Sequence, residues 1–149
     1  MRIAFLSMNK RELKKYVVDD PRVVRPLRRL GHVAEFVAWR AAVAWRKYDG
    51  VVVRTPWDYQ DHLPVFLRVL QNIEKQTRLA NPLEIVNWNA DKKIYLQDIE
   101  NRGGTIIPTI WNQGKIQSHQ IQEWFEQLQT DELVIKPTVG ANAQDAFRL

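Results

Sequence analysis

Two lysines stand at the start of a helix-like segment, in the run Asn89-Ala90-Asp91-Lys92-Lys93. If Asn89 is the N-cap, both lysines lie in the first helical turn, where the helix dipole disfavours each cation by roughly 0.3 to 1 kcal/mol. Asp91 offsets part of this cost, and an anionic ligand such as a phosphate would offset it more fully. The run therefore indicates either a phosphate-binding helix start or two solvated lysines that tolerate a small penalty.

A third lysine, Lys136, ends the apolar, strand-like run that begins at Leu133, and Pro137 follows it. Lysine is rarely buried without a partner. The small residues of the loop Thr138 to Gln144 allow the backbone to approach a phosphate closely. Lys136 and this loop are together a candidate clamp for a triphosphate. The alternative is an edge-strand lysine whose side chain points to water, which is common.

Three strands in the first half of the chain would position such residues. Apolar runs predict them at residues 2–7, 32–39 and 50–54, the last Val-rich enough to be buried on both faces. With a helix after the first strand and another after the third, the order β-α-β-β-α predicts an open α/β sheet. Ligands of such sheets bind beyond the carboxyl ends of the strands, and the segment from Arg54 to Tyr59 occupies such an end.

The two helices have start and stop signals of their own. Asp20-Pro21 predicts an N-cap followed by proline at the first helical position, Pro26 a kink, and Gly31 the end. Asp61 is the expected cap of the second helix, because apolar residues follow it at helical spacing through Ile73.

The rest of the chain predicts a second unit, so we expect domains at residues 1–85 and 86–149. Residues 79–89, which include Pro82, are expected to be a connection. Beyond them we predict a helix at 89–102 closed by Gly103-Gly104, a strand at 105–107 and a helix capped by Ser118. A strand at 132–136 follows, and 145–149 is a candidate for one more.

Composition excludes several classes of protein. The chain has 149 residues, of which 45% are hydrophobic and 26% charged, which is ordinary for a globular domain. It has no cysteine, no apolar run near the ~20 residues that a membrane helix needs, and no signal peptide pattern, so the cytoplasm is the expected location. Dinucleotide, P-loop, HExxH and GxSxG motifs are absent, and the three histidines lack metal-ligand spacing. The sequence therefore assigns no metal ligand and no catalytic residue.

The net charge of +5 is unevenly distributed, because the residues through Arg54 carry +8 and those from Thr55 onward carry −3. An anionic partner therefore has to be considered. Arg22, Arg25 and Arg29 are spaced as one solvated helix face, and that face is expected to lie opposite an apolar stripe of Val23, Leu27 and Leu30.

Three separated segments carry a resemblance to a known family. They are VVVRTPWDYQDHLPVFLRVL, ANPLEIVNWNADKKIYLQDIENRGGTIIPTIW and ELVIKPTVGANAQDAFRL. In order and spacing they resemble the first half of bacterial ATP-grasp proteins, the superfamily of glutathione synthetase and D-alanine:D-alanine ligase. The likeness runs from about Val51 to Leu149, and the preceding strand and helix resemble the leading domain of that family.

The resemblance implies an open α/β pre-ATP-grasp domain followed by the first, N-terminal subdomain of an ATP-grasp fold. It implies that Lys92 and Lys136 contact ATP phosphates under a mobile loop at residues 138–144, whose expected nucleotide-binding residues are Thr138, Gly140, Ala141 and Asn142. The implied lining of the cleft for a carboxylate or amine substrate is Arg54, Trp57, Asp58 and Tyr59. The reaction implied is formation of an acylphosphate at the expense of ATP, followed by attack of an amine to form an amide.

The sequence departs from the family pattern in two respects. The loop has a single glycine, Gly140, so its closure is expected to be stiffer than in related loops. The chain also stops where the second half of the fold is expected, with its adenine-contacting strand and its Glu and Asn ligands for Mg²⁺, so we expect the chain alone to be catalytically incomplete.

A competing interpretation is a non-enzymatic α/β module whose basic first third meets nucleic acid or another anionic partner. We rank it below the ligase, with a nucleotide and a small carboxylate or amine as the expected partners and no membrane. The sequence leaves a homo-oligomer open.

Overall fold

The computed structural model describes residues 1–141 and 143–149, which form two compact units, Met1–Asn87 and Trp88–Leu149. The first is a mixed α/β unit built on a parallel sheet, and the second is mostly helical with one short antiparallel pair. None of the helices in the described part of the chain has the length and apolar content that crossing a bilayer requires.

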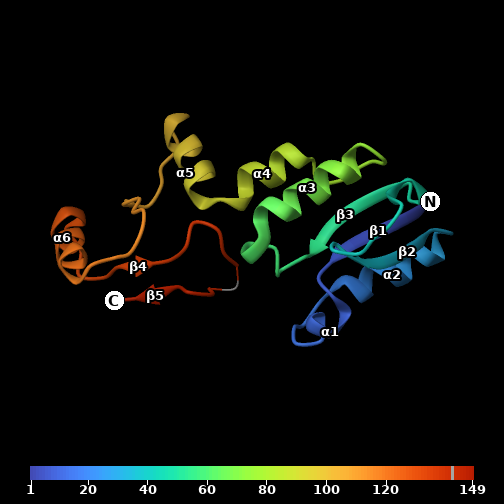
Figure 1. Cartoon of the computed structure of the whole chain (residues 1–149), viewed down its shortest axis with the longest axis horizontal. Helices are drawn as coiled ribbons and strands as arrows, with labels where there is room; N and C mark the ends of the chain where they lie inside the picture. The colour runs from blue at the N-terminus through green and yellow to red at the C-terminus, as the bar shows by residue number, and fades with distance from the viewer. Residues whose placement is uncertain (142) are drawn as a thin grey trace. The chain divides into compact units, whose positions relative to one another are not determined.

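The sheet of the first unit has the strand order β2-β1-β3 (Figure 1), with β1 at Arg2–Ser7, β2 at Val33–Ala38 and β3 at Gly50–Thr55. All pairings are parallel. The apolar runs in the sequence predicted these strands to within one residue at each end, because a parallel sheet that is covered on both faces needs continuous apolar segments.

Helices cover both faces of this sheet (Figure 1), which is why its strands are apolar on both sides. Helix α2 (Asp20–Arg29) packs on one face through Val24 and Leu27, while helix α3 (Leu63–Glu74) packs on the other through Phe66, Leu70 and Ile73. Shorter elements complete the unit: α1 (Lys10–Leu13), the 3-10 turns η1 (Trp45–Lys47) and η2 (Gln60–His62), and α4 (Leu83–Ala90).

The buried stripe of α2 differs from the expected one. Val24 is buried, whereas Val23 is 40% and Leu30 71% exposed, so the helix is rotated by about one residue from the predicted orientation. Asp19 rather than Asp20 is its N-cap, and the helix continues through Pro26. The side chains of Arg22, Arg25, Arg28 and Arg29 are exposed, as expected for a solvated face.

Two further expectations in the first unit were wrong. Helix α3 has His62 at its N-cap without a side-chain cap, because the 3-10 turn η2 takes up Asp61. The expected connection contains helix α4, which starts directly after Pro82, a residue that suits the beginning of a helix as well as a loop.

The free edge of β3 is covered by the chain that follows α3. Val51 donates its backbone N–H to the Arg78 oxygen and accepts from the Ala80 N–H, both at 2.8 Å. Further along, the Val53 N–H donates to Asn81 Oδ1 at 2.8 Å. This segment continues the ladder beyond β3 without forming a full strand.

The second unit consists of α5 (Lys92–Asn101), α6 (Ser118–Leu128), and the antiparallel pair β4 (Val134–Ile135) and β5 (Phe147–Arg148). The N-caps are Asp91 and Gln117, one or two residues from the predicted Asn89 and Ser118. Residues 105–107 do not form the predicted strand; the structure describes them as irregular chain.

Gly103 and Gly104 end α5 as predicted. The Gly104 N–H donates to the Ile99 oxygen and the Gly103 N–H to the Glu100 oxygen, both at 2.9 Å, which is a Schellman motif. Gly103 has a φ of +83°, a conformation that side chains with a Cβ rarely adopt.

Candidate functional site

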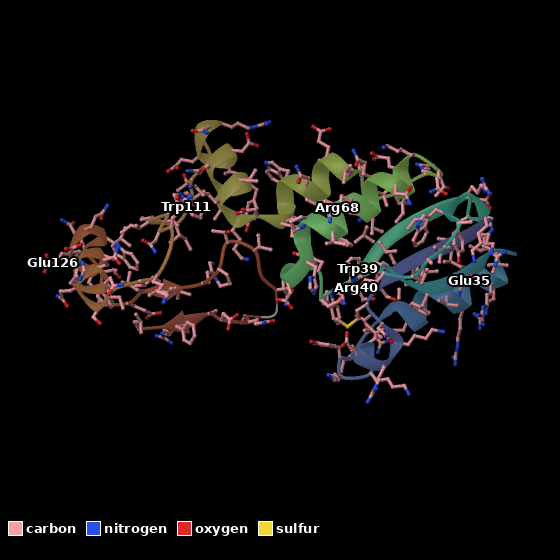
Figure 2. All side chains as sticks on the ribbon, in the orientation of Figure 1. Glu35, Trp39, Arg40, Arg68, Trp111 and Glu126 are labelled. Carbon is pink, nitrogen blue, oxygen red and sulfur yellow. The ribbon has the colours of Figure 1, made fainter. Side chains whose placement is uncertain are left out.

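The carboxyl ends of the three parallel strands meet at one edge of the first unit, where Trp39 follows β2 and Asp58 follows β3. Trp39 Nε1 donates to Asp58 Oδ1 at 2.7 Å. The other Asp58 oxygen, Oδ2, lies 3.1 Å from Arg40 Nη1, and the Arg40 guanidinium lies 4.4 Å from the centroid of the Trp39 ring. Figure 2 labels Trp39 and Arg40 side by side at this edge. A buried indole and a carboxylate thus hold one arginine in place.

These three side chains line a cavity of about 320 Å³, which we call the carboxyl-end pocket. Such a volume suits a small molecule. The lining residues come from the loop after β1, from helix α1, from the end of β2 and from the loop after β3: Asn9, Glu12, Ala38, Trp39, Arg40, Ala41 and Asp58.

Of the four residues expected to line a substrate cleft, Asp58 lies in this pocket. Trp57 instead packs edge to face against Tyr16, with ring centroids 5.3 Å apart. Tyr59 packs on Phe66 at the same centroid distance, and burial raises the pKa of its hydroxyl. Arg54 is exposed near the end of β3.

The second unit brings Lys92 together with the predicted loop. Lys92 is the first residue of α5, and its backbone N–H donates to the Thr138 oxygen at 2.9 Å. Its Nζ donates to the oxygens of Thr138, at 3.3 Å, and of Gly140, at 2.9 Å. Ala141 is half-buried in the bend that follows, and Asn142, also expected to contact nucleotide, lies outside the described residues.

Lys136 directly follows β4 and is exposed. Burial lowers the pKa of the Lys92 ammonium, the positive charge of Lys136 lowers it further, and Asp91 opposes both effects. The two amines are therefore close enough to repel one another, and Asp91, the N-cap of α5, already accepts from the Lys93 N–H at 2.9 Å. An anion bound between the amines would relieve this repulsion.

The start of α5 is oriented by contacts further along the helix. Trp88 Nε1 donates to Asp98 Oδ2 at 3.0 Å, and Arg102 Nε donates to Asp98 Oδ1 at 2.9 Å. The Trp88 ring also packs on Tyr95, with centroids 5.6 Å apart. Trp88 thereby fixes the helix that carries Lys92 at its first position.

Sequence reasoning did not single out Trp39, Arg40 or Trp88. A signal was available for the first two, since an aromatic residue and a cation directly follow a strand whose carboxyl end was expected to face a ligand. Trp88 gives no such signal, because its partner Asp98 becomes apparent only once α4 and α5 are in place.

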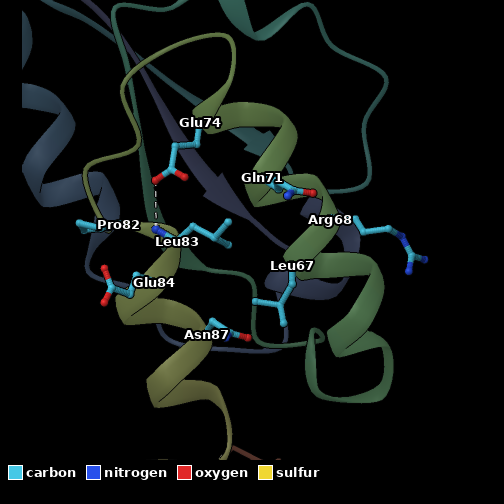
Figure 3. A pocket seen from close by; sticks show the side chains of 8 residues that line it. All are labelled: Leu67, Arg68, Gln71, Glu74, Pro82, Leu83, Glu84 and Asn87. Carbon is cyan, nitrogen blue, oxygen red and sulfur yellow. Dashed lines mark hydrogen bonds between the residues drawn. The ribbon is translucent and has the colours of Figure 1, made fainter.

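A second hollow in the first unit lies between α3 and α4 (Figure 3) and has a volume of about 520 Å³. Across it the Leu83 N–H donates to Glu74 Oε1 at 3.2 Å. Its lining contains none of the residues predicted to bind a ligand: Leu67, Arg68, Gln71, Glu74, Pro82, Leu83, Glu84 and Asn87. Within residues 1–141 and 143–149, no three His, Asp or Glu side chains gather in a way that could hold a metal ion.

Comparison with known proteins finds one family and two relatives. Residues 3–81 match the family described as the N-terminal domain of D-cycloserine synthetase DcsG. The cycloserine biosynthesis protein DcsG of Streptomyces lavendulae is 30% identical over 133 residues, which cover 87% of this chain and 44% of that protein. The crystal structure of D-cycloserine synthetase DcsG superposes with a TM-score of 0.80 at 26% identity, covering 99% of this chain and 50% of the other. The chain thus spans about half the length of these relatives.

Proposed function

The chain belongs to the family of D-cycloserine synthetase N-terminal domains, and from this premise we propose that it is the N-terminal portion of an ATP-grasp ligase. The proposed reaction activates a carboxylate by phosphorylation and lets an amine attack it, forming an amide. The family of the chain and its match to a synthetase structure support the ligase class. The use of ATP is supported by the residues around Lys92.

The observation that carries the proposal is the meeting of Lys92 with the loop after β4. Lys92 Nζ lies on the carbonyl oxygens of Thr138 and Gly140, and the charge of Lys136 lowers the Lys92 pKa. The protein thus keeps two cations near one another, at the positive end of a helix, in contact with a loop of small residues. This donor set fits the phosphates of a nucleotide, because charge-assisted hydrogen bonds from lysines to phosphate oxygens are strong.

In this function Lys92 and Lys136 bind and orient phosphates, and residues 138–142 form the cover over them. MgATP supplies the phosphoryl group that activates the carboxylate. Lys92 then exchanges its carbonyl partners on the loop for phosphate oxygens, so the loop is released from the lysine as nucleotide binds. Asp58 and the carboxyl-end pocket of the first unit are the proposed place of the small substrate.

The test is nucleotide binding to the whole protein that contains this chain. MgATP is titrated against the wild type and against Lys92→Ala and Lys136→Ala, with Lys115→Ala as the control. Lys115 is exposed, lies in the same unit and removes the same charge. The loss of one lysine–phosphate hydrogen bond, worth roughly 1.5 to 3 kcal/mol, should weaken binding by about one to two decades.

Amide cross-peaks of Thr138 and Gly140 in ¹H–¹⁵N spectra report the binding. Strong weakening by Lys92→Ala and Lys136→Ala alone supports the proposal. Equal weakening by all three substitutions reduces the effect to general electrostatics, and it would contradict the assignment of the two lysines.

A further inference from the structure

The Arg40 side chain in the first unit is fixed on two sides by residues that are fixed themselves. Asp58 Oδ2 lies 3.1 Å from its Nη1, and the Trp39 ring stacks beneath the guanidinium. Trp39 is 1% exposed and donates to the second Asp58 oxygen. Among the contacts between described residues, Asp58 accepts from one nitrogen of Arg40, so most of its N–H donors remain for a ligand in the carboxyl-end pocket.

The charges around this pocket restrict what it can hold. Arg40 is the cation of its lining, and Glu12 and Asp58 are carboxylates. A simple anion would meet two negative groups, whereas a simple cation would leave the donors of Arg40 without an acceptor. A molecule that carries both charges matches both sides of the pocket. Arginine also suits a carboxylate better than lysine does, because its planar fork donates two parallel hydrogen bonds.

We propose that the carboxyl-end pocket binds a small zwitterion, with its carboxylate on Arg40 and its ammonium group toward Glu12. As a substrate site this pocket rests on the proposed function. As a binding site it stands on the first unit alone, because all of its lining residues lie between Asn9 and Asp58.

The indole N–H of Trp39 is a built-in reporter for this site, since it lies in the hydrogen bond to Asp58 beside Arg40. Its cross-peak in ¹H–¹⁵N spectra is followed while glycine, alanine and glutamine are added, three zwitterions of increasing size. Acetate and methylammonium, the two halves of glycine, are added in separate titrations at constant ionic strength. We expect at least one zwitterion to shift the peak saturably, and to bind more tightly than either half.

Three variants test the assigned residues. Arg40→Gln should weaken zwitterion binding by at least about tenfold, the effect of losing a charge-assisted contact. Arg46→Gln, which removes the same charge from an exposed position in η1, should leave binding unchanged. Glu12→Gln should weaken the zwitterion but strengthen acetate, because it removes a negative charge that repels acetate and attracts the ammonium group.

The proposal is overturned if none of the three zwitterions shifts the Trp39 peak, if acetate binds as tightly as glycine, or if Arg40→Gln and Arg46→Gln have equal effects. These results leave the nucleotide test untouched, since that test reads Thr138 and Gly140 in the other unit. A zwitterion that binds while MgATP does not would retain the pocket and refute the ligase.

Discussion

Lys92 Nζ donates a hydrogen bond to the backbone oxygen of Gly140 at 2.9 Å, although the two residues are 48 positions apart in sequence. The contact closes the loop onto the first turn of α5 in the absence of nucleotide. It makes the lysine part of the folded structure as well as a candidate ligand for phosphate.

Lys92→Met should therefore destabilise the protein without any ligand. Methionine keeps most of the aliphatic length but leaves the Thr138 and Gly140 oxygens without their side-chain donor. For a half-exposed contact we expect a loss of about 1 kcal/mol, which lowers the Tm by about 2 to 4 °C in a chain of this size. Lys93→Met is the control, and an equal loss there would refute the role of the contact.

The pKa of Lys92 provides a second test. It lies below 10.5 because of burial first and Lys136 second. The unfolded chain lacks this shift, so the charged lysine opposes folding at neutral pH, and this penalty fades as pH rises through the lowered pKa toward 10.5. Lys136→Gln should raise the pKa of Lys92, which a ¹³C titration of its Cε measures. The same change in Lys93→Gln would argue against a specific Lys92–Lys136 interaction.

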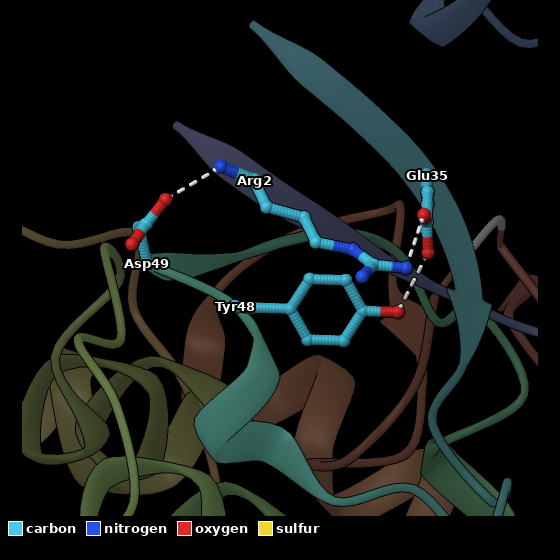
Figure 4. A network of polar contacts seen from close by, with 4 residues as sticks. All are labelled: Arg2, Glu35, Tyr48 and Asp49. Carbon is cyan, nitrogen blue, oxygen red and sulfur yellow. Dashed lines mark hydrogen bonds and ion pairs between the residues drawn. The ribbon is translucent and has the colours of Figure 1, made fainter.

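At the other end of the sheet, Tyr48 and Arg2 share the carboxylate of Glu35 (Figure 4). The hydrogen bond from Tyr48 is the largest cause that lowers the Glu35 pKa below 4.5. The carboxylate therefore adds stability above pH 4.5 that is lost as pH falls through the lowered pKa. Tyr48→Phe should cost about 1 kcal/mol at pH 7 and less at pH 3, measured by thermal unfolding at both values. A cost that is the same at both pH values would contradict the coupling.

Gly104 follows α5 where a side chain has little room. A Cβ there would lie 2.5 Å from Ile99 Cγ2 and 3.0 Å from the Ile99 oxygen. Gly104→Ala should destabilise the protein by about 1 to 3 kcal/mol. Gly50→Ala, whose Cβ would meet the Arg78 oxygen at an ordinary 3.6 Å, is the comparison in urea unfolding. Similar midpoints for the two variants would show that the α5 terminus adjusts freely.

The arginines of α2 bear on the nucleic-acid interpretation. Their exposed side chains are accompanied on this helix by Val23 and Leu30, and no aromatic residue of α2 offers a stacking surface. We expect weak binding to duplex DNA that is independent of sequence and falls steeply with salt, measured by fluorescence anisotropy. Tight, sequence-selective binding at physiological salt would instead favour the basic module.

The strands of the first unit could be predicted from sequence because each is apolar on both faces, a pattern that depends little on its surroundings. Helix starts were less certain. Asn89 and Asp91 are both good caps, and the backbone at Asp91 decided between them. Residues 105–107 have strand-like side chains but form no strand, and a strand needs a partner that local sequence does not specify.

The site shows the same division. Lys92 could be predicted because its charge conflicts with its place in a first helical turn, which is a local signal. Arg40 becomes notable only through Asp58, which lies beyond the next strand, and a contact of this kind depends on the order of strands in the sheet.

The covered edge of β3 has a consequence for how the protein behaves in concentrated solution. Val51, Val52 and Val53 form a short, uncharged, β-branched run of the kind that pairs with copies of itself when its backbone is open. The chain at Arg78–Asn81 occupies that backbone, partly through a single side-chain amide. Resistance to aggregation therefore depends on Asn81, a residue remote from both the carboxyl-end pocket and Lys92 in sequence.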